Sequence, residues 1–140
     1  MILLDTSGLL AALDASQRHH RAAAEVLLEA GGPRLLSPFV LAELDYLLST
    51  RVSLQAELAM LEEVARGAYR LEPFAADDVA AAHDVVARYR SLGIGLADAS
   101  IVVLAERCDV SEVLTLDERH FRALRDSRGR SFRLLPADRA

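Results

Sequence analysis

Ile2-Leu3-Leu4-Asp5-Thr6-Ser7 sets the architecture of this chain. An unbroken run of three apolar residues is typical of a short strand that is covered on both faces. The polar residues after it end the strand, and helical sequence is expected at once, over 7–14. A buried strand that leads directly into a helix predicts an α/β domain, with Asp5 at the carboxyl end of the first strand.

The same alternation continues along the chain. Short apolar runs predict further strands at 34–36, 69–72, 112–116 and 132–135. Helical spacing and capping residues predict further helices at 16–30, 38–50, 53–66, 75–89, 96–107 and 118–125. Ser16 is expected to cap the first of these, and Leu54, Leu58 and Leu61 mark 53–66 as amphipathic. Strands that alternate with helices predict an α/β sandwich with a mainly parallel central sheet.

The length of 140 residues and an apolar content of 52% fit one domain over residues 1–140. No window approaches the run of about eighteen apolar residues that a membrane span requires, and the N-terminus lacks the features of an export signal. We therefore expect a cytoplasmic protein without membrane contact. Cys108 is the sole cysteine, so no disulfide forms within the chain and no zinc site of the Cys/His type is expected.

The net charge of −5 argues against a general nucleic-acid coat. The C-terminal segment nevertheless carries a cationic strip, namely Arg119, Arg122, Arg125, Arg128, Arg130, Arg133 and Arg139. Such a strip is able to guide a phosphate backbone, and Arg119, Arg122 and Arg125 are the candidate contacts to it. The alternative is an ordinary solvated surface.

Four acids stand where a strand ends or in an apolar helix: Asp5, Glu43, Asp98 and Asp117. Ligands of open parallel sheets bind beyond the carboxyl ends of the strands, where Asp5 and Asp117 are expected. Carboxylates that meet there repel one another by about 4 kcal/mol per close pair at an effective dielectric near 20. A cation must lie among them, or some must be protonated.

Each acid also has a structural explanation. Asp5 and Asp117 each precede a predicted helix and are able to cap it. Asp98 lies in the first turn of a helix, where the helix dipole favours an acid by about 0.3–1 kcal/mol. That gain is smaller than the several kcal/mol that burial of an unpaired charge costs, so we expect a functional role for Asp98. Glu43 borders the core-facing stripe of its helix and needs a partner there.

An all-oxygen set of ligands suits the hard cations Mg²⁺ and Mn²⁺, which activate water and stabilise charge during phosphoryl displacement. The hydroxyls of Thr6, Ser7 and Thr115 lie next to the acids in sequence and are expected to orient them. The histidines are not expected at this site, because His19 and His20 begin a surface helix, His83 stands alone and His120 falls on an exposed basic helix.

Four segments carry a family resemblance: Met1-Ile2-Leu3-Leu4-Asp5-Thr6-Ser7, Pro38-Phe39-Val40-Leu41-Ala42-Glu43-Leu44, Leu96-Ala97-Asp98-Ala99-Ser100-Ile101 and Leu114-Thr115-Leu116-Asp117-Glu118-Arg119-His120-Phe121. In order and spacing they resemble the four motifs of the PIN-domain family, and most closely those of VapC-type toxins from toxin–antitoxin pairs. The resemblance implies a three-layer sandwich, with a five-stranded parallel sheet between helices, and metal-dependent cleavage of RNA.

Position by position, the resemblance makes Asp5, Glu43, Asp98 and Asp117 the catalytic acids of an endoribonuclease. It implies that Asp5 and Asp98 hold the main Mg²⁺, that Asp117 completes that site or a second one, and that Glu43 positions the attacking water. It also implies a homodimer and an antitoxin partner, which the helix pair over 38–66 helps to bind.

Two other functions fit parts of the sequence. A receiver-type phosphoacceptor shares the architecture and also uses Mg²⁺, but it needs a lysine late in the chain, and this sequence has no lysine. A catalytically weak PIN-like module that only binds a protein partner is the second alternative. Cleavage of RNA that requires a divalent ion and depends on Asp5 and Asp98 distinguishes a nuclease from both.

Overall fold

The computed structural model describes residues 1–139, which form five strands and seven helices. The strands are β1 (Ile2–Leu4), β2 (Arg34–Leu36), β3 (Arg70–Leu71), β4 (Glu112–Leu114) and β5 (Arg133–Leu135). The helices are α1 (Thr6–Leu13), α2 (His20–Glu29), α3 (Pro38–Arg51), α4 (Leu54–Ala65), α5 (Ala76–Arg88), α6 (Leu96–Cys108) and α7 (Glu118–Ala123). None of the helices in this part of the chain is long and apolar enough to cross a membrane.

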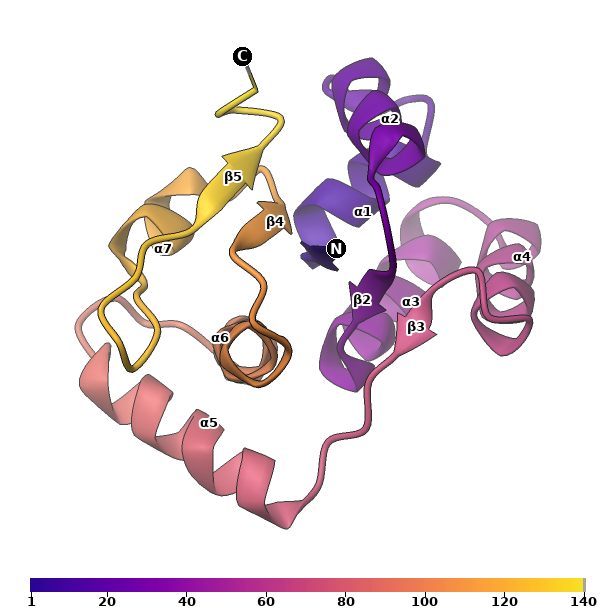
Figure 1. Cartoon of the computed structure of the whole chain (residues 1–140). Helices are drawn as coiled ribbons and strands as arrows, with labels where there is room; N and C mark the ends of the chain where they lie inside the picture. The colour runs from indigo at the N-terminus through magenta and orange to yellow at the C-terminus, as the bar shows by residue number, and fades with distance from the viewer. Residues whose placement is uncertain (140) are drawn as a thin grey trace.

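The five strands form one sheet in the order β3-β2-β1-β4-β5, and every neighbouring pair is parallel. Figure 1 shows α1 and α2 on one face of this sheet and α6, with α5 outside it, on the other. The predicted sandwich with a parallel five-stranded sheet is therefore confirmed. Because all strands run the same way, the residues that follow β1, β2 and β4 gather at one edge.

The core of the sheet is built from strands that are apolar on both faces, as their sequences predict. β1 is fully buried, and α6 packs against it with Ile101 and Leu104 completely enclosed. Burial of α6 on nearly all sides fixes its N-terminal turn, which carries Asp98, next to the end of β1.

The second helix begins later than its sequence suggests. α2 starts at His20, whereas a start at Ser16 was predicted. The Ser16 hydroxyl does not cap a helix, because it donates to Asp14 Oδ1 at 2.8 Å, and the Gln17 amide also bonds the Asp14 carboxyl. These bonds form a turn between α1 and α2.

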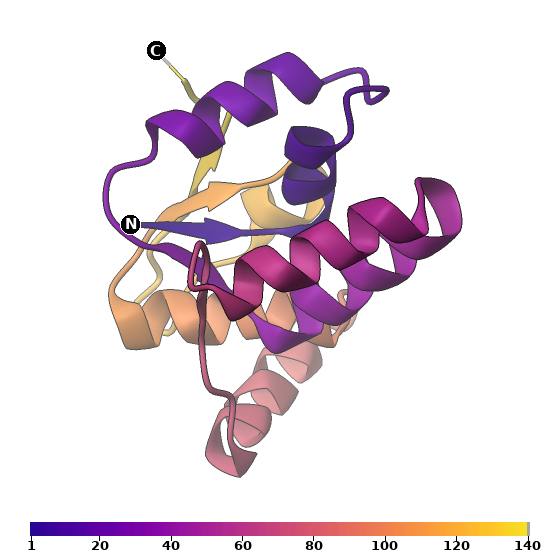
Figure 2. The same cartoon turned by 90° about the vertical axis from the view of Figure 1, so that its right-hand side faces the viewer.

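α3 and α4 form a pair that lies side by side in Figure 2. α4 packs on the core through Met60, with Ala56 and Val64 beside it. The leucines whose spacing predicted this helix lie on another face, with Leu54 64%, Leu58 55% and Leu61 38% exposed. The helix was predicted correctly, but its apolar stripe faces outward.

Gly8 permits the closest approach between a helix and a strand at the functional edge. A Cβ atom at position 8 would lie 2.4 Å from the Leu114 carbonyl oxygen and 2.6 Å from its carbonyl carbon. Because the obstacle is the backbone of β4, a side chain is accommodated only if α1 and β4 move apart. That separation would also pull apart the ends of β1 and β4.

We predict that Gly8→Ala lowers the free energy of unfolding by about 1–3 kcal/mol, the usual cost of overpacking a rigid contact. The matched control is Gly31→Ala, since a Cβ atom at position 31 meets nothing within 4 Å. Urea unfolding of both variants tests this. Equal stability of the two variants would show that α1 and β4 do not constrain each other.

Candidate functional site

Asp5 joins the ends of two neighbouring strands. The residue is 5% exposed, and its Oδ2 accepts hydrogen bonds from Ser7 Oγ at 2.8 Å and from Thr115 Oγ1 at 2.6 Å. Thr115 Oγ1 in turn accepts from the Asp117 amide at 2.9 Å. Asp5 makes no side-chain capping bond to α1, so its explanation as a helix cap fails. The hydroxyls of Ser7 and Thr115 hold this carboxylate in place.

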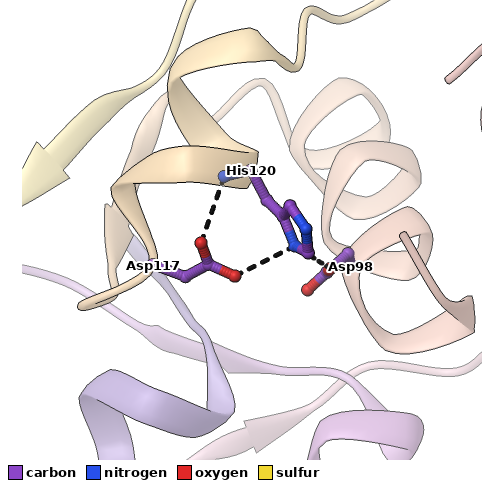
Figure 3. A group of neighbouring side chains, drawn as sticks. All are labelled: Asp98, Asp117 and His120. Carbon is purple, nitrogen blue, oxygen red and sulfur yellow. Dashed lines mark hydrogen bonds and ion pairs between the residues drawn. The ribbon is translucent and has the colours of Figure 1, made fainter. Parts of the chain in front are cut away.

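Asp98, Asp117 and His120 form a compact group next to Asp5. Figure 3 shows the three side chains pointing toward one another from α6 and from the start of α7. His120 Nδ1 lies 3.1 Å from Asp98 Oδ2 and 3.0 Å from Asp117 Oδ2. Asp117 also caps α7, because its Oδ1 accepts from the His120 amide at 3.1 Å. Asp117 therefore serves as a helix cap while its other oxygen faces Asp98 and His120.

The prediction that no histidine joins the acids is wrong for His120, whose side chain is 21% exposed. The spacing of three residues between a capping acid and a histidine places both side chains on one side of the first helical turn. This spacing was the available signal. The contact with Asp98 could not be seen in the sequence, because it depends on how α6 and α7 are placed.

Burial and the neighbouring negative charges raise the pKa values of two acids at this site. Burial raises the pKa of the Asp98 carboxyl from 3.8 to about 6, and the nearby Asp5 and Asp117 carboxylates add to the shift, while His120 opposes it. Burial also raises the pKa of Asp5, against the lowering effect of its hydrogen bonds with Thr115 and Ser7. These couplings show that Asp5, Asp98 and Asp117 share one site.

Glu43 is tied to the end of β1 by a different hydroxyl. Thr6 Oγ1 donates to Glu43 Oε1 at 2.7 Å, and Glu43 is otherwise exposed on α3. Thr6 follows Asp5 in the chain, so this bond ties α3 to the end of β1. The partner that Glu43 was expected to need is the Thr6 hydroxyl.

A buried chain of hydrogen bonds fixes α3 against α6. The Phe39 amide donates to Ser37 Oγ at 3.2 Å, Ser37 Oγ and Ser100 Oγ lie 2.6 Å apart, and Ser100 Oγ donates to the Ala97 carbonyl at 2.6 Å. The Ser37 and Ser100 hydroxyls are both hydrogen-bonded, so their burial is tolerated. The helices that carry Glu43 and Asp98 are thereby held in a fixed relation.

The arginines of the C-terminal strip are mostly engaged with acids of this chain. Arg122 bonds both Asp138 and Glu118, and the Arg125 guanidinium donates to the carbonyls of Arg122 and Leu124. Arg119 is exposed, and within residues 1–139 it forms no ion pair. Of the three candidate RNA contacts, Arg122 is paired with acids, whereas Arg119 and Arg125 form no ion pair in the part of the chain that the structure describes.

The donor set fits a divalent cation. Asp98, Asp117 and His120 each offer one ligand atom, and these atoms lie within 4.8 Å of one another. Burial, with a further contribution from the Asp5 and Asp117 carboxylates, raises the pKa of Asp98, and a bound divalent ion would offset both effects. Carboxylate oxygens are the ligands that Mg²⁺ and Mn²⁺ prefer.

We predict that Asp98→Asn stabilises the ion-free protein at neutral pH. Because the folded state raises the Asp98 pKa from 3.8 to about 6, this residue holds its proton more tightly when folded, and its contribution to stability is lost as the pH rises from 3.8 to 6. Asparagine does not ionise, so the Asp98→Asn variant does not lose stability in this way as the pH rises. The gain at pH 7.5 is about 1–2 kcal/mol, less than the full shift implies because part of the side chain faces water.

Urea unfolding in EDTA, at pH values on both sides of this range, measures the effect. Asp84→Asn is the control, because the Asp84 side chain is 82% exposed to solvent. A variant that is no more stable than the parent at pH 7.5 would show that Asp98 is not under electrostatic strain.

Comparisons with known proteins identify the family of this chain. The PIN-domain family model matches residues 2–126. Ribonuclease VapC26 of Mycobacterium tuberculosis (strain ATCC 25618 / H37Rv) is 44% identical to this chain over 135 residues, which cover 96% of this chain and all of that protein.

Two solved structures share the fold. VapC20 of Mycobacterium tuberculosis, a sarcin–ricin loop cleaving toxin, superposes with a TM-score of 0.81 at 20% identity, over 90% of this chain and 98% of that one. VapBC2 of Rickettsia felis, solved with a DNA fragment from its promoter, gives a TM-score of 0.65 at 20% identity, over 96% of this chain and 97% of that one. The chain therefore belongs to the PIN-domain family and, within it, to the VapC-type ribonucleases.

Proposed function

We propose that this protein is an endoribonuclease that depends on a divalent ion, Mg²⁺ or Mn²⁺, and that it acts as the toxin of a cytoplasmic toxin–antitoxin pair. The observation that carries the proposal is the convergence of Asp5, Asp98 and Asp117 at one edge of the sheet, with the pKa of Asp98 raised to about 6 by burial and by its neighbours. The 44% identity to ribonuclease VapC26 supports RNA as the substrate.

Asp5, Asp98 and Asp117 would hold the ion, and Ser7 and Thr115 would keep the Asp5 carboxylate in position. A bound divalent ion supplies charge stabilisation at the scissile phosphate and lowers the pKa of water. Because the protein has a net charge of −5, its own acids would disfavour RNA at this edge unless they held a cation there.

Glu43 is proposed to take the proton from the attacking water. One of its oxygens, Oε1, accepts the Thr6 hydroxyl bond, and the side chain is exposed to solvent. The hydroxyl bond orients the carboxylate and leaves Oε2 to receive a proton. Arg119, which is exposed near the start of α7, is proposed to contact the RNA backbone, and Arg122 and Arg125 remain candidate contacts beside it.

We predict that structured RNA is cleaved with Mg²⁺ or Mn²⁺ and that EDTA stops the reaction. Asp5→Asn or Asp98→Asn should slow cleavage at least about a hundredfold, because each removes a ligand from an ion that stabilises charge by several kcal/mol. Asp84→Asn serves again as the exposed control. The proposal fails if folded Asp98→Asn protein cleaves RNA at the parental rate.

The paired helices α3 and α4 are proposed to bind the antitoxin. Their outer surface exposes four large apolar side chains, Tyr46, Leu54, Leu58 and Leu61. Apolar residues grouped on neighbouring helices favour an amphipathic partner helix. VapBC2 of Rickettsia felis, which shares this fold, is a toxin–antitoxin complex and supports a partner of this kind.

Two acids indicate the chemistry of that partner. The Asp45 side chain raises the pKa of Glu57 by a hydrogen bond, so the two carboxyls lie close together across α3 and α4. Asp45 Oδ1 is buried and has no hydrogen-bond partner in the described structure. Within residues 1–139 neither acid forms an ion pair, so a cationic side chain on the partner helix is the proposed complement.

We predict that Leu58→Glu weakens binding of the cognate antitoxin at least about tenfold, because it places a charge in an apolar contact next to Glu57. Its RNA cleavage should stay at the parental level, since α4 carries none of the site acids. Leu28→Glu is the control, because Leu28 is 78% exposed on α2. Calorimetric titration with the purified antitoxin measures both, and equal affinities would place the antitoxin elsewhere.

The homodimer that the resemblance implies stays a prediction. Multi-angle light scattering of the purified chain, with and without the antitoxin, measures it directly.

A further inference from the structure

His120 has no role in the function proposed above, although its ring lies inside the acid group (Figure 3). Nδ1 is placed between two carboxylate oxygens, 3.1 Å from Asp98 Oδ2 and 3.0 Å from Asp117 Oδ2. Ionised carboxylates only accept hydrogen bonds, so in the ion-free protein a proton on Nδ1 lies between these oxygens. The imidazole nitrogen thus occupies the place where positive charge is needed most.

The ring is held in this place by the packing of α7. The His120 backbone amide donates to Asp117 Oδ1, and the next residue, Phe121, is completely buried against Phe132 with ring centroids 6.3 Å apart. Because the neighbouring residue is fixed in the core, the His120 ring is directed at Asp98 and not at solvent. Its side chain is only 21% exposed.

We propose that His120 Nδ1 is a further ligand of the divalent ion, together with Asp98 and Asp117, and that this nitrogen makes the site favour Mn²⁺ over Mg²⁺. The proposal rests on the proposed function, because it concerns the same ion. His120 would hold the ion through the Nδ1 lone pair after release of the Nδ1 proton to solvent, with the remaining ring proton on Nε2.

The spacing of the atoms agrees with shared ligation. Around a six-coordinate ion with bonds of about 2.1 Å, adjacent ligand atoms lie about 3.0 Å apart and opposite ones about 4.2 Å apart. The two distances from Nδ1 are 3.0 and 3.1 Å, and all three ligand atoms fall within 4.8 Å. The group therefore needs little rearrangement to surround an ion.

A nitrogen ligand changes the choice of ion. Mg²⁺ binds oxygen almost exclusively and retains several waters, whereas first-row transition ions accept imidazole readily. An acid group without the histidine is suited to either ion. With His120 included, the donor set gains affinity for Mn²⁺ that it does not gain for Mg²⁺.

Electron spin echo envelope modulation of the Mn²⁺-loaded full chain tests ligation directly and needs no activity. The expected result is a coupling from a directly bound ¹⁴N nucleus, which changes to the ¹⁵N pattern when the protein is labelled with ¹⁵N-histidine. Bound Mn²⁺ without nitrogen coupling would overturn the His120 proposal and leave the metal-dependent function standing. Absence of any Mn²⁺ binding would overturn both.

Calorimetry with MnCl₂ and MgCl₂ tests the selectivity. His120→Gln should lower the affinity for Mn²⁺ at least about tenfold while the affinity for Mg²⁺ changes less than about threefold. His83→Gln is the control, because His83 is 78% exposed and lies outside the acid group. Equal loss for both ions would reduce His120 to a positioning residue and contradict the proposed selectivity.

Discussion

Repulsion between Asp5, Asp98 and Asp117 is the constraint around which the functional edge of this protein is built. Each carboxylate comes from a different element, namely the end of β1, the first turn of α6 and the start of α7. A chain that only had to fold would keep these charges apart. Here burial and the neighbouring carboxylates raise the pKa of Asp98 to about 6. The ionised Asp98 therefore lowers the stability of the ion-free protein at neutral pH, and a bound cation would offset this loss.

The surrounding structure holds the acids against that repulsion. Hydroxyls from Ser7 and Thr115 bond Asp5, Thr6 bonds Glu43, and the serine pair between α3 and α6 fixes the helices that carry Glu43 and Asp98. Gly8 lets α1 approach β4 closely, which keeps Thr115, just after β4, within hydrogen-bond distance of Asp5. Small polar residues and one glycine thus position the site, and the buried strands beneath them supply the rigidity.

The sequence was sufficient for the sheet and for the positions of Asp5 and Asp117 in it, because strand ends are visible where an apolar run stops. Ile2-Leu3-Leu4 before Asp5 and Val113-Leu114 before Thr115 are such places. Contacts that depend on the relative placement of helices could not be predicted. His120 looked like a surface residue because its partner Asp98 is 22 residues away, on a different helix.

Apolar spacing was also insufficient to show which face of a helix is buried. Leu54, Leu58 and Leu61 have the period of a core-facing stripe, yet they are exposed, and Met60 on the neighbouring face of the helix packs into the core. Periodicity identifies an amphipathic helix, but it does not show whether the apolar side packs on the protein's own core or is left for a partner protein. In this chain the difference is informative, because the exposed leucines lie beside the acid pair of Asp45 and Glu57, where a partner is proposed to bind.

The acids at the carboxyl edge of the sheet are proposed to bind a divalent cation. Crystals soaked in Mn²⁺ and measured at the manganese absorption edge test it most directly. We expect an anomalous difference peak within bonding distance of Asp98 and Asp117, close to Asp5. A fully soaked crystal with no peak among these side chains, or with Mn²⁺ bound only elsewhere on the protein, would contradict it.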